Sequence, residues 1–150
     1  MMVQISITQG NNFVDNFNTI WPSILSMDSF SKKILKISIL GKTEFEGEVY
    51  RHMAPRSFTS LVQKLPIEGR IAHYQDVFVY LLTGIPVGLE KGRLNFREGD
   101  IAMLPSNGAF CIFLKNYQLS QPMTGLGRIL NGKKILSELR QGDTMKVSPS

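Results

Sequence analysis

Hydrophobic and polar residues alternate with a period of two along much of the chain beyond residue 31, as in strands with one buried face. The first such stretch has apolar residues at three alternate positions, Leu35, Ile37 and Ile39. After a turn at Gly41-Lys42, the chain returns with Phe45 and Val49 on one face and three glutamates on the other. The two stretches predict a half-buried β-hairpin.

Two segments follow a helical period instead. After Pro55, which suits the first turn of a helix, apolar residues recur at i, i+3, i+4 and i+7 until Pro66 ends the pattern. They are Phe58, Leu61, Val62 and Leu65. A second helix is predicted after Asn131, which can cap it. Further strands are predicted over residues 76–83, 99–104, 109–115, 126–130 and 144–148. Many strands with only two helices favour a closed barrel, because closure leaves no exposed sheet edge.

Composition divides the chain at residue 31. The 150 residues are 43% hydrophobic and 19% charged, as in a single globular domain. Residues 1–31 contain no Lys or Arg, so the basic start of a signal peptide is missing. We therefore read residues 1–31 as an N-terminal extension and residues 32–148 as the folded domain. No apolar run approaches the length of about 20 residues that spans a bilayer, so we expect a cytoplasmic protein without a membrane partner.

Residues that commonly carry chemistry are few and scattered. The single cysteine, Cys111, excludes an internal disulfide, and its apolar neighbours indicate an inert thiol. His52 and His73 have no carboxylate at ligand spacing, so no metal site is predicted. Two glycine–lysine sequences, at residues 41–43 and 127–134, lack other parts of a phosphate-binding loop, so no cofactor is predicted. The basic residues form no single run and are not interleaved with aromatic ones, which argues against nucleic-acid binding.

Several short segments together resemble the cyclophilin family. Residues 99–103 (GDIAM), 110–114 (FCIFL) and 127–136 (GRILNGKKIL) are similar, in order and spacing, to two strands and a turn into the last helix of cyclophilins. Residues 54–58 (APRSF) resemble the opening of their first helix, and residues 78–82 (FVYLL) fall where a further strand would lie. The likeness covers residues 32–148 and is greater to the short prokaryotic cyclophilin-like proteins, in which APR, LPIEG (residues 65–69) and GDI recur.

The resemblance implies a mainly β fold, a closed eight-stranded antiparallel barrel with two capping helices, and a groove for proline peptides on its outer wall. Cyclophilins use an arginine in that groove to weaken the prolyl amide bond. At the positions of the groove, this sequence has Tyr80 in place of the arginine, Cys111 in place of a glutamine and Met123 near a histidine. Phe113 matches the phenylalanine under the proline pocket, and Met103 matches the neighbouring wall.

From this combination we predict a binding module for a proline-containing peptide or a small apolar ligand, with no assigned catalytic residue. One alternative is a weak peptidyl-prolyl isomerase in which Arg70 or Arg93 supplies the missing cation. The other is nucleic-acid binding by residues 32–148, whose 17 basic and 10 acidic residues give a net charge of +7. For Phe113 and Met103, a place in the barrel core is the simpler interpretation.

Overall fold

The described part of the chain begins with the β-hairpin that the sequence predicts. The computed structural model describes residues 31–150, and in it β2 (Lys32–Ile39) pairs along its whole length with β3 (Thr43–Tyr50). Gly41 in the turn has a φ of 76°, which glycine adopts without strain. Leu35 and Ile37 are completely buried. The hairpin and its apolar face are therefore confirmed.

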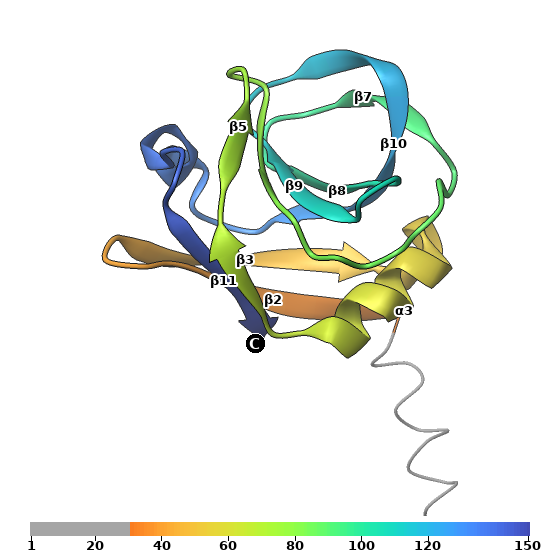
Figure 1. Ribbon diagram of the computed structural model, residues 1–150, viewed down its shortest axis with the longest axis horizontal. Coiled ribbons are helices and arrows are strands. Elements are labelled where there is room, and N and C mark those ends of the chain that lie inside the picture. Colours follow the sequence, from red (N-terminus) through yellow and green to blue (C-terminus); the bar gives the residue numbers. More distant parts are fainter. Residues whose placement is uncertain (1–30) are drawn as a thin grey trace, which may run out of the picture. The chain divides into compact units, whose positions relative to one another are not determined.

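Ten strands form one antiparallel sheet within residues 31–150 (Figure 1). The other eight are β4 (Ile67–Arg70), β5 (Ala72–Tyr74), β6 (Phe78–Leu81), β7 (Arg93–Phe96), β8 (Asp100–Leu104), β9 (Ala109–Phe113), β10 (Tyr117–Ile129) and β11 (Thr144–Pro149). Their order in the sheet is β4-β11-β2-β3-β10-β8-β9-β6-β5, and β7 pairs with β10. The mainly β, antiparallel character is as predicted.

The expected closed eight-stranded barrel is wrong, because the described sheet has ten strands and hydrogen bonds do not close it. Its two ends are β4 and β5, which follow each other in the chain with only Ile71 between them. The N–H of Ile71 donates to the Asp143 carbonyl at 2.9 Å, and its carbonyl accepts from the N–H of Gly142 at 2.8 Å. At this corner the chain itself, rather than a strand ladder, joins the two edges of the sheet.

Helices occupy two of the connections. α3 (Pro55–Lys64) buries Phe58 and Leu61 in the main core, which confirms the first predicted helix. The second is the 3-10 helix η3 (Lys133–Glu138) rather than an α-helix. It covers only six residues after Gly132, whose φ is 83°, and such short segments commonly adopt the tighter winding. A further 3-10 turn, η2 (Arg51–Met53), links β3 to α3.

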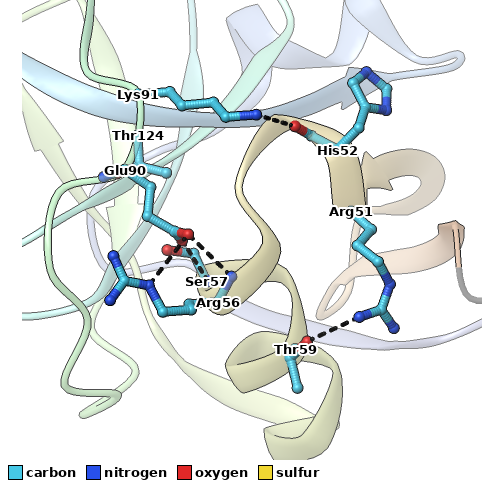
Figure 2. A network of polar contacts seen from close by, with 8 residues as sticks. All are labelled: Arg51, His52, Arg56, Ser57, Thr59, Glu90, Lys91 and Thr124. Atoms are coloured by element: carbon cyan, nitrogen blue, oxygen red, sulfur yellow. Dashed lines mark hydrogen bonds and ion pairs between the residues drawn. The ribbon is translucent and has the colours of Figure 1, made fainter.

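A buried carboxylate fixes the long connection between β6 and β7 (Figure 2). Glu90 accepts hydrogen bonds from the N–H groups of Ser57 and Arg56 at 2.7 and 3.1 Å, and so caps the N-terminus of α3. Its own N–H donates to Thr124 on β10 at 3.0 Å. Burial raises the pKa of the Glu90 carboxyl, but the two N–H donors outweigh burial and hold the pKa below its ordinary value. Glu90 thus connects the loop to the helix through its carboxylate and to β10 through its backbone N–H.

The long strand β10 pairs with three neighbours. Its first half pairs with β7, and its second half lies between β3 and β8. The register against β8 shifts between Gly125 and Gly127, which is a bulge that bends the strand. A Cβ on Gly127 would lie 1.8 Å from the Glu48 carbonyl oxygen, so only glycine permits this close approach to β3. The bend carries β7 and the first half of β10 over the outer face of the sheet (Figure 1).

Candidate functional site

Two apolar clusters lie on opposite faces of β6, β8 and β9. Successive side chains of a strand point to opposite faces, so Ile101, Met103 and Ile112 enter the main core. Ala102 and Cys111, which are paired in the register, point the other way. We call this second group the outer cluster; its buried members are Val77, Phe78, Phe96, Ala102, Ala109, Cys111, Phe113 and Met123.

Aromatic rings fill the outer cluster. Phe96 of β7 stacks on Phe113 of β9, with ring centroids 4.5 Å apart and planes 6° from parallel. Phe78 contacts Phe113 at 5.2 Å and stacks on Tyr74 at 5.1 Å. Offset stacking of this kind adds to the stabilisation from burial. The four rings therefore form a packed row from the covered centre of the cluster to Tyr74, which is 43% exposed.

A cavity of about 590 Å³ lies at the exposed end of this row. We call it the apolar cavity; it is lined by Tyr74, Phe78, Leu104, Tyr117, Gln118, Leu119, Ser120, Gln121 and Met123. Six of these side chains are apolar or aromatic, and the three polar ones carry no charge. Strands β5, β6, β8 and β10 contribute to its wall. Its volume is in the range of sites for small molecules.

The structure places the five candidate residues of the expected groove in different surroundings, rather than together along one groove. Met123 lines the apolar cavity, with only 2% of its surface exposed. Cys111 and Phe113 belong to the outer cluster and expose no surface, so they support the cavity from beneath. Tyr80 is partly buried against the same cluster and does not line the cavity. Met103 lies on the opposite face, in the main core, and the structure does not bring it to the other four.

Cys111 has the surroundings of an inert thiol. Burial strongly raises the pKa of its thiol, and its Sγ lies 3.5 Å from the carbonyl oxygen of Ala109. The thiolate, which is the nucleophilic form, is therefore disfavoured. Within residues 31–150, no three His, Cys, Asp or Glu side chains are grouped so that they could hold a metal ion.

The two arginines considered for an isomerase lie elsewhere. Arg93 forms an ion pair with Asp100 at 3.0 Å, and its guanidinium lies 4.4 Å from the centre of the Phe96 ring. Arg70 is exposed at the end of β4. Neither lines the apolar cavity, and no charged side chain of the described residues does. The lining is mainly apolar, and the described residues offer no cation there to a reacting amide.

Sequence reasoning did not identify most of the cavity residues. Tyr74, Leu104, Tyr117 and Leu119 were not among the candidates. Tyr117 and Leu119 alternate with polar residues, which is a strand signal, although a weak one over three positions. Polar residues 120 and 121 interrupt this pattern, so it does not join the predicted strand at residues 126–130, although β10 runs unbroken from Tyr117 to Ile129.

Comparisons with a protein-family model and with solved structures agree with this mainly β, antiparallel fold. The sequence model of a family described as Cyclophilin-like matches residues 33–148. The chain therefore belongs to the cyclophilin-like family, as its sequence motifs indicated. No match was found among curated proteins.

None of the helices within residues 31–150 combines the length and apolar character needed to cross a membrane.

Two solved structures share the fold. The hypothetical protein AF2241 from Archaeoglobus fulgidus, solved in solution, is 22% identical with a TM-score of 0.67. The match covers 80% of this chain and 96% of that protein. The structure of McbB in complex with tryptophan is 15% identical with a TM-score of 0.64, and the match covers 76% of this chain but 44% of McbB. At these identities the two structures establish the fold alone.

Proposed function

We propose that this cyclophilin-like domain is a binding module whose apolar cavity takes an uncharged ring or apolar group. That group is either a small apolar molecule or the proline ring of a peptide. The observation that carries the proposal is the cavity of about 590 Å³ with six apolar or aromatic lining residues and no charged one. Apolar concavities with a few polar groups at the rim are typical of small-ligand sites.

The cavity is also held in shape before any ligand arrives. In its wall, Phe78 stacks on Tyr74 and makes a tilted contact with Phe113, and Phe113 stacks on Phe96. Met123 is buried at the inner side. A cavity that is already ordered loses less conformational entropy when a ligand binds. The amide groups of Gln118 and Gln121 lie at its lining and can donate and accept hydrogen bonds, as a peptide backbone would require.

Binding is favoured over isomerase catalysis by the charges around the cavity. Rotation about a prolyl bond is accelerated by a preorganised donor that stabilises the charge developing at the nitrogen. Of the two arginines considered, Arg93 is engaged by Asp100 and Phe96, and neither Arg93 nor Arg70 lines the cavity. Tyr80, at the position of the cyclophilin arginine, carries no charge.

A methyl-detected NMR titration of the full chain tests the proposal. Two probes are added separately: a blocked Ala-Pro dipeptide, and tryptophan, the molecule bound in the McbB structure. We expect saturable shifts of the Leu104, Leu119 and Met123 methyl groups with at least one probe. Absence of saturable shifts with both probes, or shifts confined to other methyl groups, would contradict the proposal.

Two matched variants sharpen the result. Leu119→Glu places a charge on the cavity lining, where an apolar ligand would desolvate it, so affinity should fall at least about tenfold. Leu40→Glu makes the same change at the hairpin turn, at a side chain that is 77% exposed and outside the cavity. It should leave binding unchanged. Equal effects of the two variants would mean that the cavity is not the site.

A further inference from the structure

A second cavity, of about 570 Å³, shares no lining residue with the apolar cavity. It lies where β7 and the second half of β10 meet the end of β3 and the η2 turn. The charged residues that line it are Arg93, Arg97, Arg128 and Asp100. With His52 neutral, the lining therefore carries a net charge of +2. We call it the arginine cavity.

Arg93 forms a fixed wall of the arginine cavity. Its guanidinium is held by Asp100 at 3.0 Å and lies 4.4 Å above the Phe96 ring. It also lies against Gly125, where a Cβ would come within 3.0 Å of Nη1. A glycine at this position leaves the space that the guanidinium occupies. The charge of Arg93 is thus largely neutralised in place, and the excess charge belongs to the other two arginines.

Arg97 and Arg128 form no ion pair with a carboxylate of the described residues. In the register, Arg128 pairs with two acidic residues, Glu48 on β3 and Asp100 on β8. The Glu48 carboxylate already accepts the Tyr50 hydroxyl and pairs with Lys32 at 3.1 Å. These contacts, with a smaller effect of Arg128, lower the pKa of the Glu48 carboxyl against the effect of burial. Glu48 is therefore satisfied without an ion pair to Arg128.

The backbone, rather than an ion pair, positions Arg97. Its N–H donates to Oδ2 of Asp100 at 2.8 Å, the same oxygen that receives Arg93. The Asp100 carboxylate therefore holds both the turn before β8 and the Arg93 side chain. Asp100 is thereby occupied, and the Arg97 guanidinium retains its fork of donors at the edge of the cavity.

From this arrangement we propose that the arginine cavity binds the oxyanion of a small molecule, a carboxylate or a phosphate, between Arg97 and Arg128. The planar fork of donors on each guanidinium matches the paired oxygens of both groups. A long nucleic acid would need a continuous basic track. Here two cations lie in a single cavity beside Asp100 and near Glu48, whose carboxylates would repel neighbouring phosphates of a strand.

The test is an NMR titration that follows the arginine Nε–Hε signals of the full chain. Sodium phosphate and sodium succinate are added separately, at an ionic strength kept constant with sodium chloride. We expect saturable shifts of the Arg97 and Arg128 signals with at least one anion. The anion with the higher affinity shows whether the oxyanion is a phosphate or a carboxylate. Shifts that stay linear, or that chloride alone reproduces, would overturn the proposal.

Charge-removing variants complete the test. Arg97→Gln and Arg128→Gln should each weaken binding about tenfold to a hundredfold, the usual effect of losing a charge-assisted contact. Arg70→Gln, the same substitution at an exposed position outside the cavity, should have no effect. Equal losses in all three variants would indicate general attraction to a basic surface. Binding of a short oligonucleotide, without binding of phosphate or succinate, would also overturn the proposal and favour a nucleic-acid partner.

Discussion

Replacing Phe113 by alanine should strongly destabilise the domain, because the structure makes this ring part of a packed cluster rather than the accessible wall of a groove. Phe113 exposes no surface and contacts the rings of Phe96 and Phe78 at 4.5 and 5.2 Å. Truncation of such a ring removes its burial and leaves a void, which together cost about 3–5 kcal/mol of unfolding free energy. Tyr74→Ala is the matched control, because Tyr74 belongs to the same row of rings but is 43% exposed. Its loss should cost about 1 kcal/mol.

Urea unfolding followed by far-UV circular dichroism measures both variants. With a slope of about 2 kcal/mol per molar urea, the midpoint for Phe113→Ala should fall by roughly 2 M, and that for Tyr74→Ala by roughly 0.5 M. A loss below about 1.5 kcal/mol for Phe113→Ala, or equal losses for the two variants, would refute this reasoning. Phe113 would then be an accessible residue, as the cyclophilin resemblance alone implies.

Three further outcomes are expected. Burial and the raised pKa of the Cys111 thiol should prevent its reaction with a thiol reagent at pH 8 in the folded protein. Unfolding in urea should expose one reactive thiol. Rapid labelling of the native chain would contradict this prediction. The pKa of Glu90 is lowered in the folded state, so the stability that its charge contributes is present above the ordinary pKa of 4.5 and is lost as the pH falls below it. The free energy of unfolding of Glu90→Gln should therefore depend less on pH in the acid range than that of the parent chain. Identical pH dependence of the two chains would count against the capping role. A protease-coupled assay should show prolyl isomerisation no faster than the uncatalysed rate. A clear acceleration would mean that a group elsewhere in the chain supplies the cation that the lining of the apolar cavity lacks.

The elements with strong periodicity could be predicted from the sequence. The hairpin of β2 and β3 alternates over residues 35–39 and 44–49, and the stripe on α3 places Phe58 and Leu61 in the core. Both signals arise from a buried face that is apolar at every second or every third to fourth position. The segments β4, β5 and β7 have three or four residues each, which is too short for such a pattern to stand out.

The candidate site could be predicted only in part, because it depends on which strands are paired. Residues 102 and 103 are adjacent, so one of them must face the outer cluster and the other the main core. The pairing of Ala102 with Cys111 decides that Met103 lies in the main core. The segments that cover Phe113 also depend on strand pairing, because they are β7 and the part of β10 that the bend at Gly125 and Gly127 redirects. The apolar run at residues 109–114 indicates a strand buried on both faces, but it does not indicate which segments cover Phe113.

Contacts between a bound probe and the cavity wall test the central claim most directly. Intermolecular nuclear Overhauser effects can be recorded between the ring protons of whichever probe binds and the methyl groups of the full chain. The account predicts contacts to Leu104, Leu119 and Met123, which line the apolar cavity. Contacts to methyl groups elsewhere, with none to these three, would contradict it.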